Sequence, residues 1–208
     1  MEFNEESLCK RVHIGKTSSY QRWAPKQLTS FSEFAKTTFS AQKLSNKEKE
    51  LIAIGCAHTL RCSYCIDYHV DLAIKSSATD KEIAEASWVG IFIASHSVHE
   101  FFSSNAKSLG LRKESNPIRR SSEEKFQQLN SACLDDGALT HSFKLLIAIG
   151  SAQSILSFPS TKKFVDSALK MKIEEEAIEE AIWVAIEMAG GASFGYSGLT
   201  AELLERMP

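Results

Sequence analysis

Proline is scarce in this sequence, with four residues in a chain of 208, and it interrupts few of the segments in which apolar residues recur at helical spacing. The alternation of apolar and polar residues that is typical of a β-strand persists nowhere beyond a few positions. Without strand patterns, the chain is expected to bury its apolar residues between helices. The sequence therefore predicts an all-α fold.

A strong excess of either charge is absent as well. Lys and Arg number 24 against 26 Asp and Glu, which gives a formal net charge of -2 and no basic stripe. This balance argues against binding to nucleic acid or to an anionic membrane surface. No run approaches the roughly 18 apolar residues that a membrane span requires, and the start of the chain lacks the apolar core of a signal peptide. We therefore expect a cytoplasmic protein with no membrane span.

Cysteine is present in an odd number, which is not typical of a disulfide framework. The five residues are Cys9, Cys56, Cys62, Cys65 and Cys133. In the reducing cytoplasm, the close pair Cys62 and Cys65 is better explained as redox-active or metal-binding than as a structural link. Cys9 is expected in an exposed terminus, whereas Cys56 and Cys133 fall in apolar helical segments where a free thiol serves packing.

The stretch over residues 50–69, ELIAIGCAHTLRCSYCIDYH, concentrates the reactive side chains of the chain. A capping box formed by Ser45 and Glu48 predicts a helix that continues to about residue 61. A second helix is expected over residues 62–77. The reactive side chains therefore fall on two consecutive helices.

Cys62, Cys65 and His69 are separated by three and four residues, so they share one face of the second helix. Glu50, at the start of the first helix, can reach this face if the two helices pack antiparallel. A thiolate at a helix start beside an imidazole can attack a peroxide oxygen and give a sulfenic acid, which the second thiol converts to a disulfide. His69 would take the proton and Glu50 would orient the imidazole. These four residues are the candidate catalytic site, and an external dithiol would have to reduce the disulfide.

Three neighbouring side chains are candidates for a pocket around this site. His58 precedes Cys62 by four residues, and it either faces the site or is a core residue bonded to a carbonyl. Tyr64 and Tyr68 flank the cysteines, and Tyr68 is expected at the rim of the pocket.

Two other interpretations fit the same residues. Cys62, Cys65 and His69, with either Glu50 or His58, could supply four zinc ligands, but three ligands so close on one helix are cramped for a tetrahedral site. Alternatively, the thiols and the histidine only pack together in a small helical site. We expect neither a metal nor a bound cofactor.

An internal repeat runs through the chain. Residues 51–55, LIAIG, recur as residues 146–150, an offset of 95. The same offset, without a gap, pairs Trp88 with Trp183 and matches several further positions over the helices between them. A register kept over so many positions predicts a duplicated helical unit.

The duplication defines two expected domains. Residues 1–112 form an N-terminal region and the first repeat, which carries the CxxC site, and residues 113–208 form a second repeat that lacks it. The polar segment 104–122 is expected to connect them. The two repeats are expected to pack as one unit about an internal pseudo-twofold axis.

The second repeat replaces all four candidate catalytic residues. At the offset of 95 their equivalents are Leu145, Ser157, Ser160 and Phe164. The apolar frame persists while the four polar positions are lost together. We therefore interpret the four residues as one chemical unit that is present once per chain.

The order Glu50, Cys62, Cys65 and His69, with these spacings, resembles the signature of the alkylhydroperoxidase D branch of the carboxymuconolactone decarboxylase family. The flanking sequence AHTLRCSYCIDYHVDLAI and the EIAEASWV helix are also similar to the core of that family. The best-known members of the branch carry a histidine between the cysteines, where this chain has Tyr64. The resemblance is strong over residues 44–102 and extends weakly to the C-terminus through the repeat.

The resemblance implies an all-helical fold and peroxidase activity through the cysteine pair, regenerated by a lipoylated or thioredoxin-like reductant. By the same resemblance, Cys65 is the thiol that attacks the peroxide, Cys62 is the resolving thiol, and Glu50 with His69 form a proton relay. It also implies assembly into trimers or higher rings. Three tandem chains would supply six units, so we expect a homo-oligomer, either a trimer or a hexamer-like ring.

Two alternative functions remain open from the sequence. One is a decarboxylase of the lactone-cleaving branch, although that chemistry does not need a cysteine pair. The other is a non-catalytic redox-sensing or binding protein on the same fold. His96 and His99 either line the pocket from a neighbouring element or lie at a subunit contact, and we expect the contact. Aromatic and methionine residues at helical spacing are expected in the core, namely Trp88, Phe92, Trp183 and Met188.

Overall fold

The computed structural model describes residues 17–111 and 116–206, and that part of the chain contains helices and no strand. In chain order the elements are η1 (Thr17–Arg22), α2 (Pro25–Phe39), α3 (Asn46–Leu60), α4 (Ser63–Lys75), α5 (Asp80–Asn105), α6 (Pro117–Leu134), α7 (His141–Ser154), α8 (Phe158–Lys170), α9 (Glu175–Gly195) and α10 (Ser197–Arg206). The predicted all-α class is therefore confirmed. Among these described helices, none has the length and apolar character needed to cross a membrane.

The capping signals in the sequence set the starts of the site helices. Ser45 caps α3 and exchanges hydrogen bonds with Glu48, which completes the predicted capping box. The helix ends at Leu60, and its C-cap residue Arg61 has a φ of 55°, which lies in the left-handed region. Asn46, not Glu50, is the first residue of α3, so Glu50 lies in the second turn and not at the helix start.

The helices recur at the offset seen in the sequence. Helix α8 begins and ends 95 residues after α4, and α7 and α9 begin 95 residues after positions 46 and 80, where α3 and α5 begin. Two equivalent helices, α3 and α7, cross closely in the centre, where a Cβ atom added to Gly55 would lie 2.5 Å from Ile147 and one added to Gly150 would lie 2.8 Å from Ile52. The predicted boundary between residues 112 and 113 lies outside the described residues, and the division into two domains stays a prediction.

Two buried lysines link the repeats in reciprocal fashion. Lys49 of α3 pairs with Glu180 of α9, and Lys144 of α7 pairs with Glu85 of α5, each with 2.9 Å between Nζ and Oε2. Positions 49 and 144 are equivalent, and so are 85 and 180. The ammonium group of Lys49 also donates to the carbonyl oxygens at the end of α2, which ties that helix to the core.

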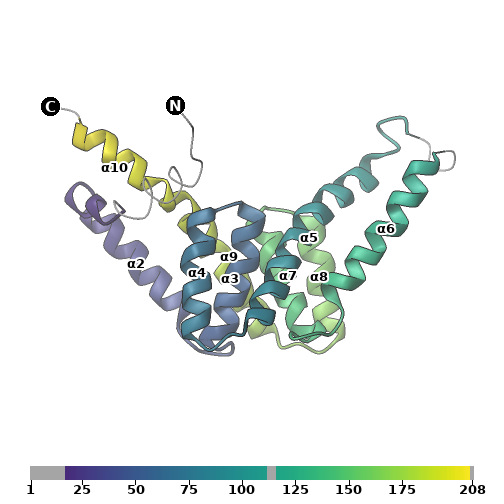
Figure 1. Ribbon diagram of the computed structural model, residues 1–208, viewed down its shortest axis with the longest axis horizontal. Coiled ribbons are helices and arrows are strands. Elements are labelled where there is room, and N and C mark those ends of the chain that lie inside the picture. The colour runs from purple at the N-terminus through teal and green to yellow at the C-terminus, as the bar shows by residue number, and fades with distance from the viewer. Residues whose placement is uncertain (1–16, 112–115, 207–208) are drawn as a thin grey trace.

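Helix α2 and the C-terminal part of the chain extend from the central bundle on one side, and the end of α5 with α6 extends on the other (Figure 1). The apolar side chains of α2 are half-buried, and Phe31 lies against Phe194 of α9 with 5.6 Å between ring centroids. The segment expected to be a connection, 104–122, is shorter than predicted, because α6 already begins at Pro117.

The expectation for the core aromatic residues is correct in part. Phe92 and Met188 are fully buried, but Trp88 is 54% exposed and Trp183 is 52% exposed. The two tryptophans occupy equivalent positions on α5 and α9, and about half of each remains exposed even though Phe34 of α2 meets the Trp183 ring edge-on. Helical spacing alone was therefore insufficient to assign them to the core.

Candidate redox-active site

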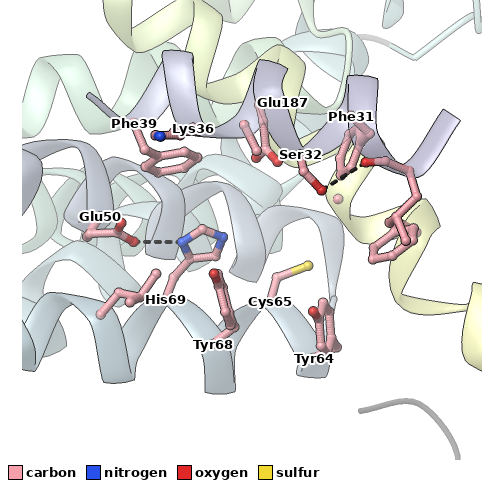
Figure 2. Close-up of a pocket in the computed structure, with 15 residues that line it drawn as sticks. Phe31, Ser32, Lys36, Phe39, Glu50, Tyr64, Cys65, Tyr68, His69 and Glu187 are labelled. Atoms are coloured by element: carbon pink, nitrogen blue, oxygen red, sulfur yellow. Dashed lines mark hydrogen bonds and ion pairs between the residues drawn. The ribbon is translucent and has the colours of Figure 1, made fainter. Parts of the chain in front are cut away.

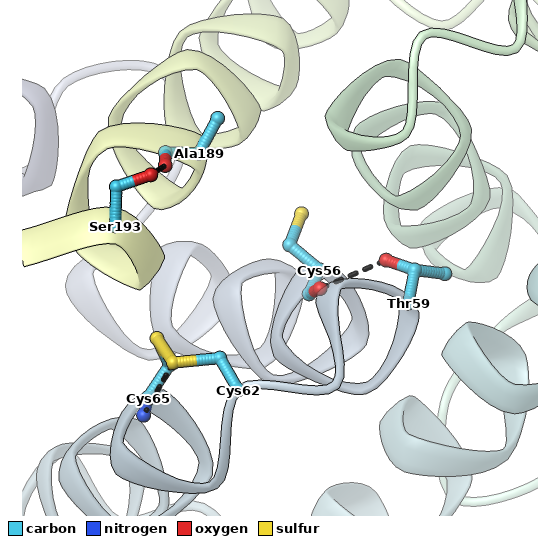
Figure 3. The surroundings of a disulfide bond; sticks show 6 residues. All are labelled: Cys56, Thr59, Cys62, Cys65, Ala189 and Ser193. Atoms are coloured by element: carbon cyan, nitrogen blue, oxygen red, sulfur yellow. Dashed lines mark hydrogen bonds between the residues drawn. A yellow bond between two sulfur atoms is a disulfide. The ribbon is translucent and has the colours of Figure 1, made fainter. Parts of the chain in front are cut away.

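Cys62 and Cys65 are joined by a disulfide bond in this structure, with 2.08 Å between their sulfur atoms (Figure 3). Cys62 is the N-cap residue of α4, and its Sγ accepts a hydrogen bond of 3.1 Å from the backbone N–H of Cys65. The sequence begins the helix here because the residue after Arg61 is extended, which leaves the first amides of α4 free to be capped. The structure therefore describes the oxidised form of the pair.

Glu50 and His69 form a buried pair between α3 and α4. The distance between Glu50 Oε2 and His69 Nδ1 is 2.7 Å, and the two side chains are 7% and 8% exposed. A carboxylate at Nδ1 favours the tautomer that carries its hydrogen there, which leaves Nε2 as a basic nitrogen. Figure 2 shows this second nitrogen on the side of the ring that faces Cys65. The antiparallel packing expected from the sequence thus brings three candidate residues together.

Aromatic rings hold the imidazole in place. The Phe39 ring of α2 stacks on His69 with 5.2 Å between centroids, and Tyr68 meets it edge-on at 5.2 Å. Tyr64 stacks on Tyr68 in turn. The orientation of His69 is therefore fixed from one side by Glu50 and from the others by packing.

A cavity of about 330 Å³ lies over these residues, between α2, α4 and α9. Cys65 lines it, together with Glu50 and His69, and both predicted pocket tyrosines belong to its wall, Tyr64 and the half-exposed Tyr68. The rest of the wall is mainly apolar. Its apolar residues are Leu28, Phe31, Ala35, Phe39, Leu72 and Phe194.

Two of the predicted site residues do not line this cavity. Cys62, at the helix start, is not among the lining residues, although both cysteines are buried, with 5% of Cys62 and 2% of Cys65 exposed. His58 is half-buried near the end of α3, away from the cavity wall, and burial lowers its pKa. Of the two alternatives for His58, its position favours a packing role.

Glu187 of α9 is a site residue that the sequence reasoning missed. It is 5% exposed, it lines the cavity, and its Oε2 has no hydrogen-bond partner among the described residues. Burial raises the pKa of its carboxyl group, the charge of His69 opposes this change, and the charge of Glu50 adds to it. A signal was available, because the offset of 95 pairs Glu187 with Phe92, which places a carboxyl group at a core position.

The predicted subunit contact of His96 is wrong. His96 is 3% exposed and lies inside the chain, with Nδ1 3.1 Å from Ser160 Oγ and Nε2 2.9 Å from Lys163 Nζ. His99 pairs with Glu123 at 3.0 Å.

The remaining cysteines follow the expected pattern where they can be seen. Cys56 and Cys133 are buried free thiols, and burial raises the pKa of both. Cys9 lies outside the described residues. Over residues 17–111 and 116–206, no three His, Cys, Asp or Glu side chains are grouped so that they could share a metal ion.

Comparison with known proteins gives a family match over the part of the chain that holds the site, and a match to one curated relative. Residues 25–96 match the sequence profile of the Carboxymuconolactone decarboxylase family. The chain is also 39% identical over 59 residues to a protein of Paracoccus denitrificans described as "Uncharacterized protein 4 in cox locus". The aligned part makes up 28% of this chain and 53% of the relative, so the chain spans about half the length of that relative.

Proposed function

We propose that this chain, whose residues 25–96 belong to the carboxymuconolactone decarboxylase family, is a thiol-dependent peroxidase or disulfide reductase that acts through Cys62 and Cys65. The observation that carries the proposal is the disulfide between these cysteines, next to the Glu50 and His69 pair, at the wall of a cavity large enough for an organic substrate. Family membership by itself names no reaction for this chain.

Cys65 is the attacking thiol in this proposal because it lines the cavity and Cys62 does not. His69 takes the proton of Cys65, and the Cys65 thiolate attacks the outer oxygen of the hydroperoxide. The O–O bond breaks, the alkoxide takes up a proton and leaves as an alcohol, and Cys65 becomes a sulfenic acid. Glu50 holds the imidazole and stabilises its positive charge.

Cys62 completes the oxidation step. The N–H of Cys65 donates to the Cys62 sulfur, which stabilises a thiolate there. This thiolate attacks the sulfur of the sulfenic acid and displaces hydroxide, which leaves as water after it takes up a proton. The product is the disulfide that the structure contains.

A dithiol must then reduce the disulfide for turnover. We propose a lipoylated or thioredoxin-like protein for this step, because both present a reactive dithiol on a mobile arm or exposed loop. The reaction would take place in the cytoplasm. No bound cofactor or metal enters the scheme.

The protein is proposed to act as a homo-oligomer, a trimer or a hexamer-like ring. Trp88 with Ile91 on α5, and Trp183 with Ile186 on α9, form exposed apolar faces at equivalent positions. Paired faces of this kind are typical of subunit contacts. A monomer by light scattering at micromolar concentration would contradict the assembly without affecting the chemistry.

Stopped-flow oxidation with cumene hydroperoxide, followed by thiol counting, tests the function. We expect two of the five thiols to disappear at a rate well above that of free cysteine. The Cys133→Ser variant, which removes a buried thiol outside the cavity, should still lose two thiols at the same rate. Oxidation no faster than that of free cysteine would leave the decarboxylase or the non-catalytic alternative.

A further inference from the structure

The carboxyl group of Glu187 is placed where the proposed reaction needs a proton. It comes from α9, in the second repeat, and lines the same cavity as Cys65 and His69. Figure 2 shows it across the pocket from these two residues. A side chain from one half of the chain therefore completes the wall of a site built on the other half.

The proposed peroxide cleavage has an unmet requirement. Attack of a thiolate on an alkyl hydroperoxide expels an alkoxide, which is a strong base and a poor leaving group unless it is protonated as the O–O bond breaks. In the proposed scheme the Glu50 and His69 pair takes the thiol proton, and its positive charge then stabilises the Cys65 thiolate. An acid on the opposite wall of the cavity would protonate the departing oxygen without removing that charge.

We propose that Glu187 is this acid, a catalytic residue that donates its proton to the leaving oxygen of an organic hydroperoxide bound between α2 and α4. The inference rests on the proposed peroxidase function. In the step, sulfur gains the outer oxygen, the O–O bond breaks, and the inner oxygen takes the Glu187 proton to give the alcohol. Glu187 is left as a carboxylate and regains a proton from water when the alcohol departs.

The surroundings of Glu187 suit an acid that is protonated before reaction. Its Oε2 is buried and makes no hydrogen bond to the described residues, so no donor there stabilises the charged form. The titratable groups that share its cavity in the reduced protein are Lys36 of α2, Glu50 of α3, and Tyr64, Cys65, Tyr68 and His69 of α4. None of them forms an ion pair with it in the structure. The unpartnered oxygen is free to bond a substrate oxygen.

The apolar wall indicates the class of substrate. Three phenylalanines, Phe31, Phe39 and Phe194, surround the space next to Glu187, and the cavity of about 330 Å³ exceeds what hydrogen peroxide needs. A hydroperoxide with an aromatic or branched apolar body would bury that body against the rings while its peroxide group lies between Cys65 and Glu187.

The test compares leaving groups in the full-length reduced protein and its Glu187→Gln variant, which keeps the shape of the side chain. Cumene hydroperoxide releases an alkoxide, peroxybenzoic acid releases a carboxylate that is stable without protonation, and iodoacetamide releases iodide and needs no acid. We expect the variant to react roughly 100-fold more slowly with cumene hydroperoxide. Its rates with peroxybenzoic acid and iodoacetamide should stay within about threefold of the unmodified protein, a margin far smaller than a lost acid would cause.

Glu179→Gln is the matched control, because Glu179 lies on the same helix but is exposed and outside the cavity. It should leave all three rates unchanged. Equal slowing of Glu187→Gln with all three reagents would show a packing role, and unchanged rates would show no role, so either result overturns the inference while the peroxidase proposal stands. If the unmodified protein itself reacts with both peroxides no faster than free cysteine, the proposed function fails and the inference falls with it.

Discussion

The two halves of the chain place different side chains at the same positions of one frame, and this difference decides which side chains line the cavity at Cys65. Position 65 is a cysteine and its equivalent, position 160, is a serine; His69 corresponds to Phe164. On the long helix opposite, Glu187 of the second half corresponds to Phe92 of the first. Cys65, His69 and Glu187 all line the cavity, and each of their equivalents is apolar or unreactive.

The most informative exchange is between Gly191 and His96. Gly191 of the second half lines the cavity, where its lack of a side chain leaves room beside Glu187. At the equivalent position in the first half, the His96 ring packs against Phe92, Phe126 and Phe164, with centroids 5.5, 6.4 and 5.2 Å away. A histidine therefore fills the space that the glycine leaves open, so the site depends on a small residue of the second repeat as well as on the cysteine pair of the first.

The largest difference between the two halves should appear when the attacking thiol of the first half is replaced. Cys65→Ser is expected to abolish consumption of cumene hydroperoxide, because serine does not form a nucleophilic anion at neutral pH. Cys62→Ser should instead stop after one step and leave a sulfenic acid on Cys65, which dimedone labelling and mass spectrometry detect.

Ser160→Ala, at the position equivalent to Cys65, is the matched control and should leave peroxide consumption unchanged. Dimedone labelling of Cys62 in the Cys65→Ser protein, with peroxide still consumed, would reverse the order of the two cysteines. Attack by Cys62 is the main alternative, because the Cys65 N–H donates a hydrogen bond to the Cys62 sulfur and would stabilise a thiolate there.

The reciprocal ion pairs should contribute unequally to stability. Lys49→Met leaves the Glu180 carboxylate, 14% exposed, without its cation and removes two hydrogen bonds to the end of α2. Lys144→Met leaves Glu85, which is 30% exposed and keeps more of its hydration. We expect losses in the free energy of unfolding of about 3 kcal/mol for the first and about 2 kcal/mol for the second.

Urea denaturation of the two variants measures this difference. Lys49→Met should also slow peroxide consumption, because α2 forms one wall of the cavity, whereas Lys144→Met should not. Equal losses of stability in the two variants would mean that the exposure of the partner carboxylate does not determine how much unfolding free energy is lost.

Much of this arrangement was predictable from local sequence signals. The capping box at Ser45 and the three- and four-residue spacings were sufficient to predict two helices, and their antiparallel packing was sufficient to bring Glu50 to His69. These contacts are short-range in the chain, so periodicity determines them. The closure of the cavity is not short-range, because Glu187 and Gly191 come from the second repeat and reach the site only through the packing of α9 on α2 and α4.

Two errors have different physical origins. The polar and basic first turns of α6 favour a connection, although Asn116, whose side chain caps the helix, and Pro117 at its first position are local signals of a helix start. Trp88 and Trp183 are not core residues, because helical spacing identifies an apolar residue but not the side on which a neighbouring helix lies. The second assignment requires the tertiary arrangement, which propensity does not contain.

The proton relay of Glu50 and His69 should affect how the reactivity of the Cys65 thiol depends on pH. We expect this effect to be smaller than that of replacing Cys65. In a Cys62→Ser background, the rate of alkylation of Cys65 by iodoacetamide should rise with pH, with a midpoint below the roughly 8.5 of a free thiol. His69→Gln should move the midpoint up towards the free-thiol value, because the base and its positive charge are gone. Glu50→Gln should move it less in the same direction. Superimposable curves for all three proteins would mean that neither residue acts on the thiolate.

The packed histidine of the first half, His96, should make the protein sensitive to acid. Burial first, and then the charges of Lys163 and His99, lower the pKa of His96 from 6.5 to about 4. Between these values the unfolded chain binds a proton at this position and the folded chain does not, so stability is complete above about pH 6.5 and falls as the pH drops towards 4. After allowance for solvent screening, we expect this histidine to account for about 1 kcal/mol of the stability lost between pH 7 and pH 5.

Urea denaturation at pH 7, 6 and 5, of the unmodified protein and of His96→Gln, isolates this contribution, because all other groups titrate in both proteins. The difference in unfolding free energy between the two should shrink as the pH falls. The Glu187→Gln variant should show the opposite dependence of stability on pH. The raised pKa of Glu187 means that the folded chain binds this proton more tightly than the unfolded chain. The unmodified protein therefore loses stability relative to the variant as the pH rises above about 4.5. Parallel pH profiles for His96→Gln and the unmodified protein would show that the pKa of His96 is the same in the folded and the unfolded chain. In that case Glu100, whose Oε2 lies 3.8 Å from His96 Nε2, would offset the effect of burial.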